Sequence, residues 1–152
     1  MGEANNNTAF LRFRKSVVDY LALVPGITDF LPNVTGLNLA FGSDADSAML
    51  PRIRCHLTTH NPFVPDAPEV LDATVQIDFF SRDANATIQA AESVYYYIAA
   101  TGIAGIVDSD IHITGAYPLT IMRLGEVAAP DIRDVFASTI TVQFIWRGVY
   151  AP

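Results

Sequence analysis

The chain has 152 residues and a mass of 16.5 kDa, a size that suits one domain and leaves little room for two. Charged residues make up only 16% and hydrophobic residues 51%, which excludes an intrinsically disordered chain, because disorder needs low hydrophobicity and high charge density. The net charge of −7 argues against a general nucleic-acid binder, because neutralising phosphates requires a basic face.

The first part of the chain predicts one helix. Residues 1–7 are polar and rich in asparagine, which is typical of a disordered terminus. Over 9–24, apolar residues recur at spacings of three and four and form one stripe, which predicts an amphipathic helix. The Pro-Gly pair at 25–26 ends this helix. From 26 to 49 we expect a long loop that contains a short strand over 37–42.

From residue 50 the hydrophobic pattern changes to a period of two, which is typical of strands. It predicts one strand over 50–59 and a second over 69–80. Between them, 60–68 holds three prolines. Because proline lacks the N–H that pairs strands, we expect this segment to be a long, stiff loop that joins the two strands as an antiparallel hairpin.

The second half of the chain predicts one helix and two strands, and it leaves open one extra strand. The helix covers 84–100 and is capped by Ser81 or Asp83. Alternating apolar residues then predict strands over 111–127 and 133–147. This order of elements predicts a single α+β domain over 1–152, with a mostly antiparallel sheet and two helices packed on one face.

The sequence offers little for catalysis or metal binding. His56 and His60 stand four apart along a strand, a span of roughly 13 Å that is too long for one metal ion. Asp108–His112 gathers two carboxylates and an imidazole, but it lacks a second anchoring element and is better explained as a solvated turn. The acidic turn over 42–47 lacks the glycine and the distal glutamate of an EF-hand loop.

No nucleophile elbow, Walker loop, zinc-protease motif or dinucleotide fingerprint occurs. The single cysteine, Cys55, excludes an intramolecular disulfide, and it lies on the apolar side of its strand as a small core residue. No apolar run is long enough to span a bilayer, and the N-terminal residues lack the layout of a signal peptide. We therefore expect a soluble protein that is not an enzyme and has no catalytic residue, metal or cofactor.

Aromatic residues point instead to a protein–protein contact. Three successive tyrosines in the second helix lie about 100° apart, so at least one must face outwards. In the last strand, polar residues alternate with apolar ones, so the polar side is expected to face outwards. Ile145 of this strand and Phe80 of the strand over 69–80 fall on sides that the alternation predicts to be exposed. Tyrosines in such places are commonest at interfaces, where they bury area while the hydroxyl stays hydrogen-bonded. The predicted subunit interface consists of Tyr95, Tyr96, Tyr97, Thr139, Thr141 and Gln143.

The layout resembles the tail terminator, or tail-completion, proteins of long-tailed bacteriophages and gene transfer agents. One strand ends in Phe-Phe-Ser-Arg-Asp and runs directly into an Ala-rich helix, and the last strand ends in Phe-Ile-Trp-Arg-Gly. The segments that carry the likeness are Val75–Ile98 and Phe136–Gly148, with Phe10–Val24 as further support.

This resemblance implies a structural virion protein that assembles into a six-membered ring on the head-proximal end of the tail tube. The ring would stop tube polymerisation and offer a docking surface to the head connector. The implied partners are further copies of the chain, the tail tube protein and the head connector or neck protein, assembled in the cytoplasm of a bacterial host. DNA would cross the lumen without specific binding, repelled by acidic loop residues that include Asp44, Asp46, Asp66, Asp108 and Asp110.

Two other interpretations remain open. A head–tail connector, a neck protein or another minor tail protein would have a similar size and patterning. In a different class, a small α+β ligand-binding domain or enzyme would use the Asp108–His112 turn together with His56.

Overall fold

The computed structural model describes the backbone of residues 2–36, 38–42, 50–64, 67–102, 111–129 and 132–148, and the side chains of a smaller set within them. Eight elements follow in chain order: α1 (Gly2–Leu23), α2 (Pro25–Phe30), β1 (Leu39–Phe41), β2 (Arg52–Val64), β3 (Ala67–Ser81), α3 (Ala84–Thr101), β4 (Ile111–Ala129) and β5 (Ile132–Gly148). The α+β class is therefore confirmed.

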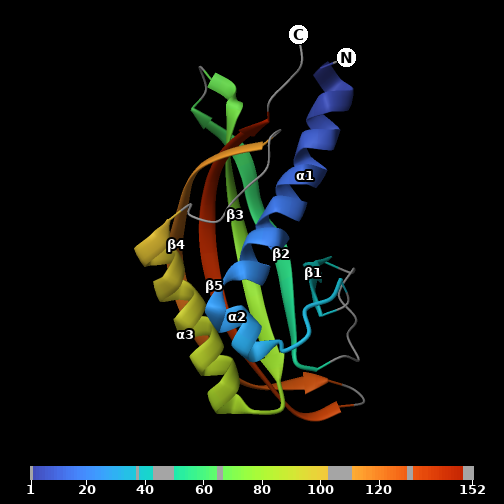
Figure 1. The fold of residues 1–152 in the computed structure, drawn as a ribbon, viewed down its shortest axis with the longest axis vertical. Coiled ribbons are helices and arrows are strands. Elements are labelled where there is room, and N and C mark those ends of the chain that lie inside the picture. Colours follow the sequence, from blue (N-terminus) through green and yellow to red (C-terminus); the bar gives the residue numbers. More distant parts are fainter. Residues whose placement is uncertain are drawn as a thin grey trace.

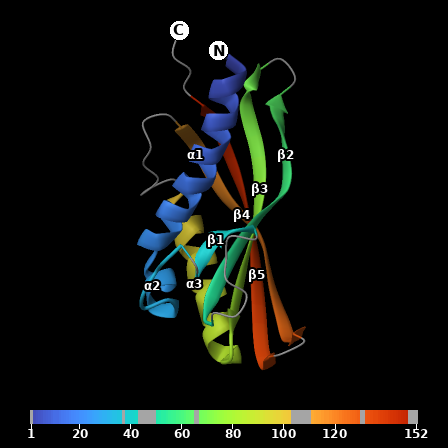
Figure 2. The same ribbon diagram turned by 90° about the vertical axis from the view of Figure 1, so that its right-hand side faces the viewer.

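The strands form one five-stranded sheet in the order β1-β2-β3-β5-β4. The short strand β1 runs parallel to β2, and every other neighbouring pair is antiparallel. All three helices lie on the same side of this sheet (Figure 1). Seen edge-on, the molecule has a helix layer on one side and the bare sheet on the other (Figure 2).

The core lies between the helix layer and the sheet. From α1 it receives the stripe that the sequence predicts, and Phe13, Val17 and Leu21 are fully buried. Alternate residues of the central strands face this stripe, among them Val75, Ile77, Ile140, Val142, Phe144 and Trp146. Cys55 is buried among them, which confirms its place on the apolar face.

The ends of α3 follow from two residues. The Asp83 carboxylate accepts hydrogen bonds from the backbone N–H groups of Asn85 and Ala86 at 3.0 and 3.2 Å, so Asp83 is the N-cap. At the other end Gly102 has a φ of +61°, a conformation that glycine adopts without a steric penalty.

The structure corrects the prediction that residues 26–49 form a long loop with only one short strand. Residues 25–30 form α2, a third helix that the sequence pattern does not predict. Pro25 occupies its first turn, where a missing N–H costs nothing. Gly26 then lets α2 approach α3 closely, since a Cβ there would lie 2.6 Å from Ser93 Oγ. The predicted strand over 37–42 is present as β1.

The predicted loop over 60–68 is also wrong, because β2 continues to Val64 and β3 begins at Ala67. The pairing of β3 with β5 starts only at Leu71. Beyond that point β2 and β3 form a two-stranded ribbon, in which each strand has a free outer edge that tolerates a proline. Pro62 pairs there with Leu71.

The N-terminus differs as well, because α1 begins at Gly2 and not near residue 9. No proline interrupts residues 2–8, and the three asparagines cost only a few tenths of a kcal/mol each in a helix. The other predicted elements are confirmed with small shifts at their ends: 69–80 as β3, 84–100 as α3, 111–127 as β4 and 133–147 as β5.

Candidate assembly surfaces

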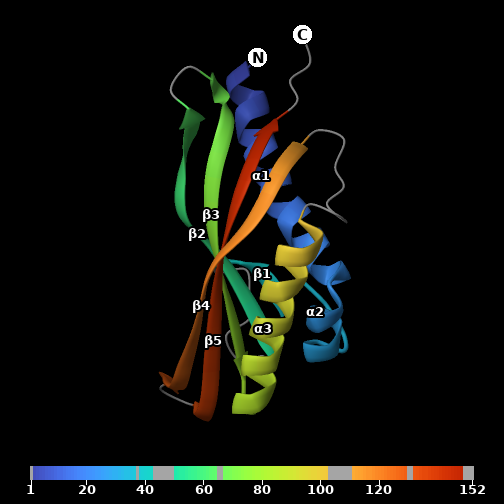
Figure 3. The ribbon, with the colours of Figure 1, turned by 90° about the vertical axis from the view of Figure 1, so that its left-hand side faces the viewer.

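The first candidate surface is the face of the sheet that points away from the helices. No helix in the described part of the chain lies over it (Figures 2 and 3). The strand alternation places Arg52, Arg54 and His56 of β2 on this face, in register with Phe80, Asp78 and Gln76 of β3. We call it the open face.

A polar network centred on Asp78 occupies the middle of the open face. Arg54 donates to Asp78 Oδ2 from Nη2 at 3.0 Å and from Nε at 3.3 Å. The other carboxylate oxygen accepts from Thr139 Oγ1 at 2.8 Å and from Gln76 Nε2 at 2.9 Å. The Asp78 side chain is only 3% exposed. The hydrogen bonds of this carboxylate therefore link β2, β3 and β5.

Some residues of the predicted subunit interface form hydrogen bonds inside the sheet. Thr139 is buried, and its hydroxyl points at Asp78. Gln143 donates to Asp72 Oδ2 at 2.8 Å, across the β3–β5 pair. Thr141 lies between them on the same face and is half-buried. Of these three strand residues, two therefore hydrogen-bond within the sheet.

Phe80 and Ile145 were expected to be exposed, and both expectations are wrong, because these residues are only 6% and 8% exposed. The guanidinium groups of Arg52 and Arg54 lie 4.4 and 5.2 Å from the centroid of the Phe80 ring. At the other end of the face, Gly115 is the register partner of Ile145. The Tyr117 ring lies over this glycine, where an added Cβ would fall 2.6 Å from Tyr117 Oη. The alternation of apolar and polar residues along a strand cannot predict that side chains from neighbouring strands will bury a residue on the outward face.

The two histidines of β2 lie on opposite faces of the sheet. A register shift between Leu57 and Thr59 moves His60 to the helix side, where it pairs with Ala73. There its ring stacks on Trp146, with centroids 5.6 Å apart, and burial lowers the pKa of the His60 imidazole against the opposing effect of Asp72. His56 stays on the open face, with Nδ1 3.7 Å from Asp78 Oδ2. This bulge keeps the two imidazoles apart.

The second candidate surface is the outer side of α3. Tyr96 is 63% exposed, whereas Tyr95 and Tyr97 pack against the core and are half-buried. The rings of Tyr95 and Tyr96 meet edge to face at 5.3 Å. The expectation that at least one of the three tyrosines faces outwards is therefore confirmed, and Tyr96 is that residue.

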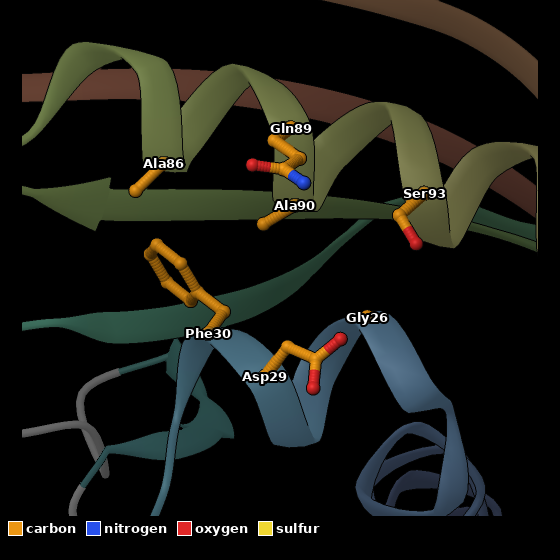
Figure 4. Close-up of a pocket in the computed structure, with 7 residues that line it drawn as sticks. All are labelled: Gly26, Asp29, Phe30, Ala86, Gln89, Ala90 and Ser93. Atoms are coloured by element: carbon orange, nitrogen blue, oxygen red, sulfur yellow. The ribbon is translucent and has the colours of Figure 1, made fainter.

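A small cavity of about 130 Å³ lies between α2 and α3. Asp29 and Phe30 of α2 face Gln89 and Ser93 of α3 across it (Figure 4). It brings together one carboxylate, one amide and one hydroxyl.

Several predicted residues fall outside the described part of the structure. All five lumen candidates do so: Asp44, Asp46, Asp66, Asp108 and Asp110. The side chain of His112 does so too, which leaves the Asp108–His112 cluster untested. Among the residues that are described, no three His, Cys, Asp or Glu side chains gather as metal ligands, and no helix has the length and apolar character to cross a membrane.

Comparison with known proteins adds no assignment: no protein-family model and no curated protein matches this chain.

Proposed function

We propose that this chain is a structural protein of a bacteriophage tail, which forms a ring on the end of the tail tube. The ring stops tube polymerisation and provides the surface on which the head connector docks. The protein performs no catalysis in this role.

The observation that carries the proposal is the amount of uncovered apolar and strand-edge surface on one small chain. Among the side chains that the structure describes, five large apolar residues on helices or strands are exposed by 47% to 65%: Leu11, Leu23, Tyr96, Tyr117 and Leu119. The strand β4, which is 19 residues long, forms one edge of the sheet. Long free edges invite pairing with other chains, and a closed ring removes them.

The shape of the molecule supports the same role. The β2–β3 ribbon lies at one end of the molecule, level with the N-terminal end of α1, and the β4–β5 ribbon lies at the other end, level with the start of α3 (Figure 1). The pairing of β3 with β5 ends at Ser81 and Phe136, while β4 and β5 stay paired to Ala129 and Ile132. With a ribbon at each end, a ring subunit would have strands available for contacts above and below its own layer, as a protein between a tube and a connector requires.

Charge accounts for the passage of DNA. The net charge of −7 makes non-specific adhesion of DNA unfavourable, because both carry the same sign. Asp44, Asp46, Asp66, Asp108 and Asp110 remain the proposed lumen residues. Reversing several of them to lysine is expected to slow DNA ejection, and unchanged ejection would count against this assignment.

The decisive experiment is electron microscopy of tails produced without this protein. Loss of termination predicts tubes of uncontrolled length, and expression of the intact chain restores the normal length. Tails of normal length that fail to join heads would point to a neck protein instead. Normal tails that join heads, together with bound metal or ligand-dependent stabilisation of the purified protein, would favour a binding domain or an enzyme.

A further inference from the structure

The cavity between α2 and α3 adjoins a second, larger hollow. The cavity has a volume of about 130 Å³, and the hollow has a volume of about 450 Å³. Asp29, Phe30 and Ala86 line both spaces. A cavity of roughly 150 Å³ can hold one benzene molecule. The α2–α3 cavity therefore has room for one small planar group, and the hollow has room for the body that carries this group.

Three polar side chains from two helices line the α2–α3 cavity. Asp29 belongs to α2, and Gln89 and Ser93 belong to α3. The Ser93 hydroxyl points from α3 towards α2 (Figure 4). None of these three side chains forms a hydrogen bond or an ion pair within the part of the chain that the structure describes. Their hydrogen-bonding capacity is therefore available to a ligand.

The α2–α3 cavity suits a positive charge. Among the described residues that line it, Asp29 alone carries a charge. The side-chain oxygens of Gln89 and Ser93 can accept further hydrogen bonds. The Phe30 ring lies beside the cavity, and the face of an aromatic ring attracts cations (Figure 4). The net charge of −7 attracts cations to the molecule as a whole.

A planar organic cation fits this cavity better than a metal ion does. Calcium takes roughly six to eight oxygen ligands, and no three His, Cys, Asp or Glu side chains gather among the described residues. A guanidinium or amidinium group is weakly hydrated, and its parallel N–H groups bind one carboxylate through two hydrogen bonds. One aspartate with a neighbouring amide and hydroxyl is therefore enough to hold such a group.

The adjoining hollow favours a ligand with one positive charge and an apolar body. Its apolar lining consists of Phe30, Leu50, Pro51 and Ala86. Arg82 also lines the hollow and forms no ion pair in the described part of the chain, so it would repel a second positive charge on the ligand. The Asp83 carboxylate lines the hollow as well, but it is engaged as the cap of α3.

We propose that the α2–α3 cavity binds the guanidinium or amidinium group of a singly charged ligand, and that the adjoining hollow takes the apolar body of this ligand. Asp29 binds the cation, and Gln89 and Ser93 accept hydrogen bonds from its remaining N–H groups. The ligand is either a free small molecule or an arginine side chain of another protein. This inference goes beyond the proposed function and does not depend on it.

Benzamidine is the probe for this site, and benzamide, which has nearly the same shape without the charge, is its matched control. In an NMR titration of the isotopically labelled chain, millimolar benzamidine is expected to shift the amide signals of residues 26–30 and 86–93, and benzamide is expected to shift them much less. A blocked Leu-Arg-Leu peptide and its citrulline counterpart distinguish the two sources. Binding of the arginine peptide assigns a protein side chain, and binding of benzamidine alone assigns a small molecule.

Asp29→Asn is expected to weaken benzamidine binding about tenfold, because it removes a charge-assisted hydrogen bond and keeps the shape of the cavity. The fold is expected to persist, since Asp29 is exposed and has no partner within the described structure. Ala86→Leu narrows the cavity without changing its charge and should also weaken binding. Asp19→Asn is the matched control: it changes the net charge equally, but it lies on α1 and lines neither space, so binding should be unchanged.

Equal affinities for benzamidine and benzamide would overturn the assignment of a cation to this cavity. Equal affinities of the unmodified chain and Asp29→Asn for benzamidine would overturn it as well, and so would amide shifts that arise only outside α2 and α3, or no shifts at all. The tail-length experiment decides the proposed function separately, whatever the result of this titration.

Discussion

At the scale of single residues, Asp78 illustrates how the open face is held together. It is an almost fully buried carboxylate on the face that no described helix covers, and it accepts hydrogen bonds from Arg54, Gln76 and Thr139. A buried charge is tolerated only when its partners replace the water it loses. The residue is therefore a link between β2, β3 and β5.

Replacing Asp78 by alanine is expected to lower the free energy of unfolding by about 2 kcal/mol, because it leaves Thr139 and Gln76 without their acceptor. Urea unfolding measures the change. Asp19→Ala is the matched control: its ion pair with Lys15 is exposed and should contribute less than about 0.5 kcal/mol. Equal losses in the two variants would contradict the structural role of Asp78.

Cys55 makes a second prediction. Burial raises the pKa of its thiol from 9.0 to about 12, with a smaller contribution from the Asp78 carboxylate. The folded protein should therefore not react with a thiol reagent at pH 8, while one thiol per chain should react in urea, because the thiolate is the nucleophile.

The raised pKa of the Cys55 thiol makes the free energy of unfolding depend on pH. Below pH 9 the thiol is protonated in both states and contributes no slope. Between pH 9 and about 12 the unfolded chain loses this proton and the folded chain keeps it, so the free energy of unfolding falls as the pH rises. The difference between the unmodified chain and Cys55→Ala isolates this slope from the tyrosines; a constant difference across that range would contradict it.

At the scale of elements, the start of α3 depends on one cap. Asp83→Ala removes the acceptor of two backbone N–H groups and should cost about 1 kcal/mol in thermal or urea unfolding. Arg82→Ala changes the exposed neighbour and is expected to have little effect. A negligible loss for Asp83→Ala would mean that packing against the sheet holds this end without the cap.

The proline-bearing ribbon shows how element and context interact. Three prolines predict a loop when each is weighed alone, because proline removes a ladder hydrogen bond. In the ribbon formed by the ends of β2 and β3, however, only one side of each strand is paired. Whether a proline breaks a strand depends on neighbours that lie far away in the sequence.

At the scale of the whole molecule, Tyr96 is the exposed part of the predicted interface. If α3 takes part in the proposed ring, Tyr96→Asp is expected to weaken that ring strongly, because it would bury a carboxylate in an apolar contact. Tyr96→Phe keeps the ring surface and should preserve assembly. Light scattering and negative-stain microscopy measure both, and an intact oligomer with aspartate at this position would remove α3 from the interface.

Much of the fold follows from local patterns. The period of three to four in α1 and the period of two in β3 and β5 predict these elements and the side of each that is buried, because both periods come from backbone geometry alone. The strand pattern likewise predicts Cys55 as a core residue, whereas the sequence leaves Ser81 and Asp83 as alternative caps of α3 and the structure decides for Asp83.

Other features required the tertiary structure. The burial of Phe80 and Ile145, the separation of His56 from His60 and the formation of α2 all depend on contacts between distant segments. The hollow between α1 and β1, lined among others by Leu11 and Phe41, likewise combines residues that lie more than 20 positions apart. A sequence pattern indicates which side of an element faces inwards. Only the packed chain decides which neighbours cover the outward side and which surfaces stay exposed.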